Sequence, residues 1–199
     1  MSNTILNGES FDGITFTDLS NIQDTISRKV FESCVFESCD FTEAFFDACT
    51  FKDCRFVKCK LTAINVRNSK FSDVQFYDSK VLGVDWTKAY WRGLDLGSSL
   101  YFKACLVNAS SFYGLKQPGI TFEDCRAHDV DFREATLSRA KFSGTDLTNS
   151  LFVNTNLTGA DFNGATHYDI DVKKNTIKNA IFCRYEAVSL LTSLGIKLV

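Results

Sequence analysis

Large apolar side chains recur at every fifth residue over most of this chain of 199 residues. From residue 31 to residue 96 all fourteen positions of this phase are apolar. At an apolar content of 45%, chance would produce such a run roughly once in 100,000 trials. The phase shifts by one residue and resumes from Phe102 to Phe162, broken only at Gln117. Of the 19 phenylalanines, 18 follow the pattern, which predicts a core that includes Phe31, Phe36, Phe41, Phe51, Phe56, Phe132, Phe142 and Phe152.

A second inward position precedes each of these residues by two. It carries small side chains almost throughout, as at Cys34, Cys39, Ala44, Cys49 and Cys54. Neither a helix of period 3.6 nor a strand of period 2 repeats at five residues, so the backbone must turn a corner in each quintet. Large and small inward side chains, with polar residues at the other three places, predict the wall of a narrow prism.

Tandem quintets such as those in CDFTEAFFDACTFKDCRFVKCKL and DFREATLSRAKFSGTDLTNSLFVNTNLTGADF resemble the pentapeptide-repeat family, whose consensus is A-(D/N)-(L/F)-x-x. The resemblance implies an all-β solenoid, a right-handed quadrilateral parallel β-helix with four quintets in each coil. Coils stacked about 4.8 Å apart would build a rod of about eight coils and roughly 40 Å. We expect this repeat unit to occupy residues 1–183, and a separate C-terminal unit to occupy residues 184–199.

Two places interrupt the repeat, and both are expected to bulge outward. The frame slips near residues 97–101, where Gly97 or Ser98 is the extra residue after Leu96. The quintet 115–119 departs from the pattern without changing the phase. Each interruption is either a tolerated defect or a partner-contacting loop, because function concentrates where a rigid scaffold is interrupted. On the second reading Lys116, Gln117 and Pro118 are contact candidates.

The C-terminal residues abandon period five. Residues 186–194 have a helical apolar spacing, followed by Gly195 at a position suited to a helix stop and by a short strand signal at 196–199. An open β-helix end must be capped, and this stripe is wider than one rod end can cover. We therefore predict a capping and dimerisation helix, with a two-fold homodimer interface formed by Ala187, Leu190, Leu191, Leu194, Ile196 and Leu198.

The eight cysteines do not predict a metal site. Zinc ligands pair at C-x2–4-C, whereas seven of the eight share the small inward phase with Ala and Ser. A core thiol is the favoured interpretation. Cys34 and Cys54 should stack one coil apart, but side chains in parallel register do not offer the disulfide torsion.

Catalytic machinery is also not predicted. His128 should point outward, and His167 lies on the fading core phase as a capping residue. The sequence contains no glycine-rich phosphate loop and no nucleophile elbow. An Asp before the core residue is a repeat feature that supports a turn or faces water. We expect neither an enzyme nor a bound cofactor.

Charge is distributed in bands along the chain. The formal net charge is −2, which does not favour direct nucleic-acid binding. Residues 1–50 carry a net −7, residues 51–100 a net +4 and residues 121–171 a net −5. No apolar run reaches the length of a membrane span, and MSNTILNGES does not look like an export signal. We expect a cytoplasmic protein with reduced thiols and no membrane partner.

Several segments point to a subgroup of the family. LGVDWTKAYW, SSFYGL, CRAHDVDFREA and the C-terminal tail resemble proteins that protect type II topoisomerases, most of all the albicidin-resistance member, together with quinolone-resistance and microcin-immunity members. The resemblance implies a dimeric rod that occupies the DNA-binding saddle of DNA gyrase and protects the enzyme from inhibitors. Local DNA mimicry would then use the acids of 121–171. These are Glu123, Asp124, Asp129, Asp131, Glu134, Asp146 and Asp161.

Two alternatives remain open from the sequence. The acids of 121–171 can equally form an ordinary solvated face. The chain can also be a generic β-helical protein-interaction scaffold with no topoisomerase role, because a fold alone does not define a function.

Overall fold

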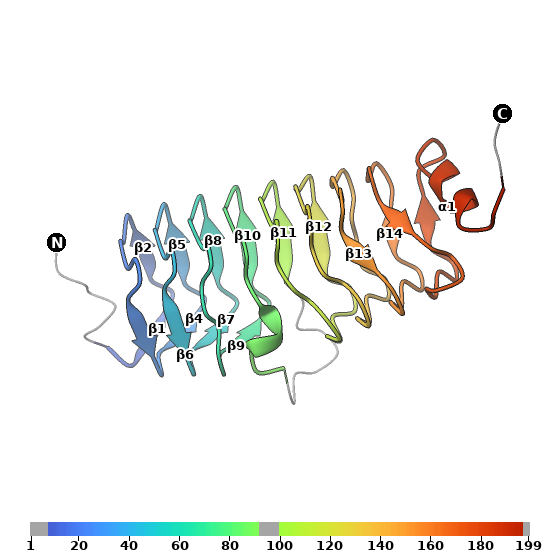
Figure 1. Cartoon of the computed structure of the whole chain (residues 1–199). Helices are drawn as coiled ribbons and strands as arrows, with labels where there is room; N and C mark the ends of the chain where they lie inside the picture. The colour runs from blue at the N-terminus through green and yellow to red at the C-terminus, as the bar shows by residue number, and fades with distance from the viewer. Residues whose placement is uncertain (1–7, 92–99, 197–199) are drawn as a thin grey trace.

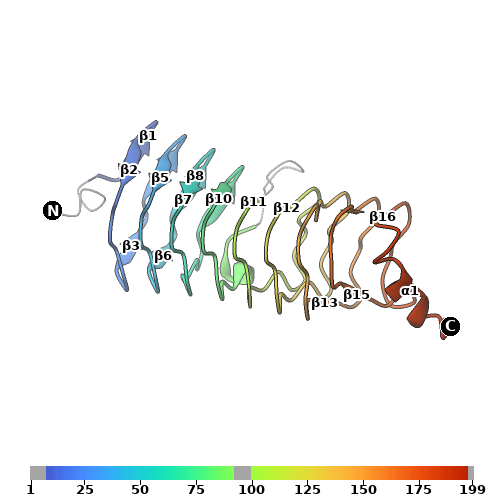
Figure 2. The ribbon, with the colours of Figure 1, turned by 90° about the horizontal axis from the view of Figure 1, so that it is seen from above.

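The computed structural model describes residues 8–91 and 100–196. They form the predicted right-handed quadrilateral parallel β-helix, with about eight turns. Successive coils stack from one end of the rod to the other, so strands that are neighbours in space lie one coil apart in sequence (Figure 1). The same stack is visible from above (Figure 2).

Four walls surround the core, numbered here in the order in which the chain visits them. Wall 1 contains β1 (Ser10–Asp12), β4 (Val30–Glu32), β7 (Thr50–Lys52) and β9 (Lys70–Ser72). Wall 2 contains β2 (Thr15–Thr17), β5 (Val35–Glu37), β8 (Arg55–Val57), β10 (Gln75–Tyr77), β11 (Tyr101–Lys103), β12 (Thr121–Glu123), β14 (Asp161–Phe162) and β16 (Ile181–Phe182). Wall 3 consists of single bridges such as Asp40 with Lys60 and Arg126 with Asp146. Wall 4 contains β3 (Thr25–Ser27), β6 (Phe45–Asp47), the 3-10 turn η2 (Trp86–Lys88), β13 (Leu151–Phe152) and β15 (Asp169–Ile170).

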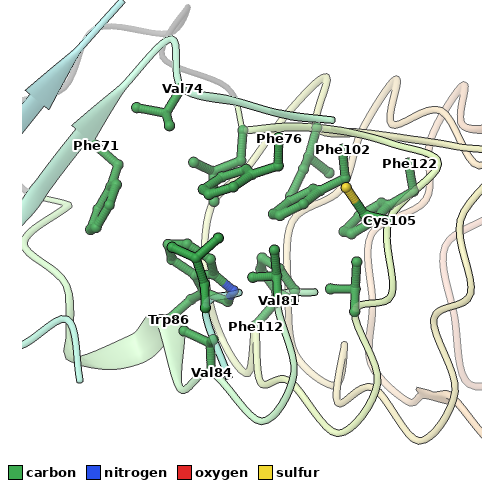
Figure 3. Packing of buried hydrophobic residues seen from close by; sticks show 14 of the residues in the cluster. Phe71, Val74, Phe76, Val81, Val84, Trp86, Phe102, Cys105, Phe112 and Phe122 are labelled. Atoms are coloured by element: carbon green, nitrogen blue, oxygen red, sulfur yellow. The ribbon is translucent and has the colours of Figure 1, made fainter. Parts of the chain in front are cut away.

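The core is the predicted phenylalanine phase. The eight phenylalanines predicted as core residues are at most 3% exposed, which confirms them. Rings in successive coils stack face to face, and rings on adjacent walls meet edge to face. Figure 3 shows Phe76, Phe102 and Phe122 in one such row, facing Trp86 and Phe112. Burial of one core side chain in almost every quintet, most often Phe, is the main stabilising contribution.

Most corners in the described part of the prism use a left-handed backbone residue. It follows the core residue by two positions, as at Asp53, Asn68 and Asp124, where φ is 52°, 57° and 52°. Asn, Asp and Gly adopt this region at low cost, which explains why they recur there. The prediction of one corner in every quintet is confirmed.

The small inward position is buried as predicted. Cys34, Cys49 and Cys54 are fully buried free thiols. Their Sγ atoms donate to backbone carbonyls, for example Cys54 to Phe31 O at 3.3 Å. These cysteines are therefore core-filling residues.

The frame slip is larger than predicted. Phe76 pairs with Phe102, so this coil holds 26 residues where the preceding one, from Phe56 to Phe76, holds 20. The insertion is therefore six residues, not one. The sequence could not show this, because insertions of one and of six residues shift a five-residue repeat by the same amount. The ladder resumes in register on wall 2. Leu96, Gly97 and Ser98 lie outside the described residues.

The predicted outward bulge at 115–119 is wrong. Lys116 bridges to Thr136, and Gln117 N donates to Thr136 O at 2.9 Å, as in a regular coil. The Gln117 side chain points inward and is only 2% exposed. Pro118 fits because residues that follow the core position donate no ladder bond, so a missing N–H costs nothing there.

The C-terminal end carries α1 (Val188–Thr192) (Figure 1). The helix contacts β15. This helix is shorter than the predicted 186–194, and turns flank it on both sides. Gly195 has φ of 77°, as predicted for a stop residue. Ile196 is not in a strand, and Leu198 lies outside the described residues. Within the described part of the chain no helix is long and apolar enough to cross a membrane.

Candidate functional site: acidic walls and an apolar end

The seven predicted acidic contact residues do not form one face. Glu123, Asp124 and Asp161 belong to wall 2 or its corner. Asp146 and Asp129 belong to wall 3 or its corner, and Asp131 and Glu134 to wall 4 or its corner. An interval of five residues turns the chain onto the next wall, so acids close in sequence diverge in space. The expectation of a single acidic patch is therefore wrong.

Three of these acids support the backbone. Asp131, Asp146 and Asp161 each accept a hydrogen bond at Oδ1 from the backbone N–H two residues later, at 3.1, 3.1 and 2.9 Å. That N–H is the one that makes no ladder bond. The prediction that an Asp before the core residue supports the turn is thus confirmed for these three residues. Their carboxylates are therefore only partly available to a partner.

Glu123 is held by two neighbours on wall 2. Lys103 Nζ donates to its Oε1 at 2.7 Å, and Tyr101 Oη donates to its Oε2 at 2.6 Å. These two bonds lower the pKa of Glu123. Asp131 is similarly paired with Arg133, whose guanidinium lowers the pKa of that carboxyl. Among the seven acids, Asp124, Asp129 and Glu134 are the exposed ones.

Asp146 lies between two histidines. Its Oδ2 is 2.8 Å from His128 Nε2 and its Oδ1 is 2.9 Å from His167 Nδ1. Burial alone would raise the pKa of Asp146, but hydrogen bonds from Thr148 and both histidines hold it well below its ordinary value. The His167 backbone N–H also donates to Glu186 at 3.1 Å, which links this cluster to the C-terminal turns. The core-phase interpretation of His167 is wrong, because Tyr168 is buried in its place.

The predicted contact residues at 115–119 also differ in how exposed they are. Lys116 is exposed on wall 1 and Pro118 is half-buried, whereas Gln117 is enclosed by the core. A partner can therefore reach Lys116 but not the Gln117 side chain.

Apolar side chains collect at the C-terminal end of the rod. Of the predicted interface, Ala187, Leu190 and Leu191 are half-buried, and Leu194 and Ile196 are exposed. The prediction missed Ile181, Tyr185 and Val188, which are also exposed, Tyr185 by 82%. Tyr185 and Val188 fall between the positions of the helical stripe, so periodicity could not identify them. No residue of α1 is buried.

Neither a metal centre nor a redox centre is suggested by the geometry. Among the residues that the structure describes, no three His, Cys, Asp or Glu side chains converge on one point. Burial raises the pKa of Cys49 to about 11 and that of Cys54 to about 12, which keeps these thiols protonated at neutral pH.

Comparisons with known proteins cover most of the chain. The family described as pentapeptide repeat region matches residues 29–112, and the one described as pentapeptide repeats (8 copies) matches residues 119–152 and 131–166. Comparison with curated protein sequences finds no match.

Among solved structures the chain is similar to QnrB1, a plasmid-mediated fluoroquinolone resistance protein. Two trypsin-treated variants of QnrB1 give TM-scores of 0.71 and 0.66 at 19% and 21% identity; each match covers 96% of this chain and 97% or 92% of QnrB1. The full-length protein gives 0.65 at 20% identity, with 92% of this chain and all of QnrB1 covered.

Proposed function

Because the chain belongs to the pentapeptide-repeat family, we propose that it binds DNA gyrase or a related type II topoisomerase and protects that enzyme from inhibitors. Proteins with this repeat fold are generally non-enzymatic scaffolds, so the activity would reside in the surface of the rod. The observation that carries the proposal is the match to a fluoroquinolone resistance protein over 96% of this chain and 97% of the other. The placement beside the albicidin-resistance member stays a prediction.

The active form in this proposal is a homodimer through the C-terminal ends. Eight spacings of about 4.8 Å separate the first and last core phenylalanines of wall 2, Phe16 and Phe182, so one rod is roughly 40 Å long. Tyr185, Val188 and Leu194 expose apolar surface at the end of that rod, and a second copy would cover it. The pair would then extend for about 80 Å.

Mimicry of DNA by this dimer would depend on shape more than on charge. A duplex of about 80 Å carries about 47 negative charges, whereas two chains of −2 carry −4. Local negative charge would come from the exposed residues Asp124, Asp129 and Glu134 near the dimer centre. The half-buried acids Glu123, Asp131, Asp146 and Asp161, whose oxygens accept the hydrogen bonds described above, contribute less.

A supercoiling assay tests the proposal. DNA gyrase is assayed with and without a fluoroquinolone, and the purified chain at micromolar concentration is expected to restore supercoiling. Asp129→Lys with Glu134→Lys should weaken that effect while circular dichroism stays unchanged. Lys116→Glu, at an exposed site on wall 1, serves as the charge-change control. If the wild-type chain is inert with gyrases from several bacteria, the generic scaffold replaces the topoisomerase proposal.

A further inference from the structure

Wall 4 is hollowed beside the C-terminal end. A pocket of about 580 Å³ opens there, lined by residues 148–153 of one coil and by His167, Asp169, Asp171 and Lys174 of the next. Figure 2 shows β13 and β15, the two strands that border it. None of the predicted partner-contact residues lines this pocket, and of the cluster around Asp146 only His167 does.

The pocket arises from a local change in coil length. Phe152 pairs with Ile170, 18 residues later, so the corner between walls 3 and 4 is two residues short. Asn156 pairs with Thr176, at the regular interval of 20, so two residues are added back after Ile170. Thr148 and Asn149 of the preceding coil are not buried at this short corner. Lys174, which lies in the lengthened segment after Ile170 and donates its backbone N–H to Asp171 O, lines the other side of the pocket.

The floor of the pocket is apolar. Leu151 and Val153 flank the buried Phe152 and point outward, with 45% and 37% of their surfaces exposed. In the preceding coil the equivalent positions hold Asp131 and Arg133, which form an ion pair with each other. These two aliphatic side chains lie between coils that present charged residues at the same positions, and they form a site for an apolar ligand surface.

The rim is acidic. Asp169 and Asp171 flank the buried Ile170 on β15, so both carboxylates are on the outer face, two residues apart. Asp171 Oδ1 accepts a hydrogen bond from Lys173 N at 2.9 Å, and Asp171 Oδ2 lies 3.3 Å from Lys174 Nζ. Asp169 is exposed and is therefore the more available of the two carboxylates. His167 is engaged by Asp146. Two carboxylates against one ammonium leave a net negative rim. A carboxylate matches a planar guanidinium, which presents five donors in a fork, better than it matches the point charge of an ammonium.

We propose that this pocket binds an arginine side chain presented by a protein partner, with its aliphatic stem on Leu151 and Val153 and its guanidinium between Asp169 and Asp171. An apolar floor under an acidic rim is complementary to arginine, because its methylene stem is buried while its charge is paired. The proposal requires only that the partner is a protein, so it holds whether or not that partner is a topoisomerase.

The test is a titration of the ¹⁵N-labelled full chain with Nα-acetyl-arginine amide, followed by backbone NMR. Saturable shifts at residues 151–153 and 167–174 are expected, with a Kd in the low millimolar range, as is typical of a single side chain. The citrulline analogue, which has the same shape without the charge, should bind at least tenfold more weakly, and the lysine analogue at least threefold more weakly.

Variants locate the site. Asp169→Asn and Asp171→Asn should each weaken binding at least threefold and Leu151→Ser at least twofold. Asp161→Asn, at the equivalent position on wall 2, is the matched control and should leave binding unchanged. Unchanged thermal melting shows that each variant is folded. Equal binding of arginine and citrulline, equal binding of arginine and lysine, or no shift at 50 mM probe would each overturn the proposal.

Discussion

Phe76 and Phe102 stack with ring centroids 4.9 Å apart although 26 residues separate them, six more than separate Phe56 from Phe76. Both pairs of rings are stacked face to face, with an interplanar angle of 8° for Phe76 and Phe102 and of 13° for Phe56 and Phe76. The stack of core rings on wall 2 therefore continues across the longer coil, because β10 pairs with β11 in register, Phe76 with Phe102.

Deletion of residues 92–97 should yield a regular coil. Trp91 would then be followed by Ser98, Ser99, Leu100, Tyr101 and Phe102, which restores the interval of five. We expect a folded protein whose melting temperature, measured by circular dichroism, lies within a few degrees of wild type. Loss of gyrase protection by this folded variant would favour a partner-contacting role for the insertion, and full protection would favour a tolerated defect. An unfolded product would contradict the register described above.

Phe132→Asp should unfold the protein. Phe132 is fully buried between stacked rings of two neighbouring coils, and an unpaired charge there costs several kcal/mol. Phe45→Asp is the control, because Phe45 is the phenylalanine outside the core phase and is only half-buried. Circular dichroism and sedimentation decide the outcome. A soluble, native-like Phe132→Asp protein would contradict the assigned core.

Alkaline pH should destabilise the protein through its buried cysteine thiols. Burial raises the pKa of Cys49 to about 11 and of Cys54 to about 12 from 9.0. The unfolded chain therefore ionises first, so the stability from these neutral thiols is complete below pH 9 and decreases as the pH rises from 9 toward 12. Chemical denaturation at pH 8 and pH 10 measures this decrease, and the double variant Cys49→Ala, Cys54→Ala should show a smaller one. An equal decrease in both proteins would exclude the thiols as its cause.

Tyr168→Phe should stabilise the protein by about 1 kcal/mol. The Tyr168 hydroxyl is buried and finds no hydrogen-bond partner among the residues that the structure describes, and burying an unpaired hydroxyl costs about 1–3 kcal/mol. The ring would keep its contacts with Phe162 and Phe182. Urea denaturation at pH 7 measures the change. A clearly less stable variant would show that the hydroxyl is satisfied in solution.

Val188→Asp with Leu194→Asp should produce a folded monomer. Both side chains are exposed in a single chain, so the changes leave the fold intact, whereas in the proposed dimer they would place charges in an apolar interface. Ile22→Asp, which alters an equally exposed residue near the opposite end, is the control and should stay dimeric. Light scattering should give about twice 22.3 kDa for wild type and for the control. A wild-type mass near 22.3 kDa would remove the dimer from the proposed function.

The period of five residues was sufficient to predict a narrow prism with a phenylalanine core and a small inward position, and the resemblance to the pentapeptide-repeat family implied the β-solenoid. These properties depend on the residue type at each step of a single quintet, and a quintet has the same local geometry wherever it occurs. Phe132 and Cys54 could therefore be placed in the core, and Asp146 assigned to the turn-supporting position, from the sequence alone.

Tertiary structure decided how quintets meet across coils. Sequence spacing leaves lengths that differ by five indistinguishable, so only the pairing of Phe76 with Phe102 revealed a six-residue insertion. Side chains from different coils meet at intervals near 20, as His128, Asp146 and His167 do, and local periodicity carries no information on such contacts. The pocket over Leu151 and Val153 depends on a coil shortened by two residues and lengthened again. The pocket forms because backbone hydrogen bonds keep the two coils paired, Phe152 with Ile170 and Asn156 with Thr176, although the number of residues between these pairs differs in the two coils.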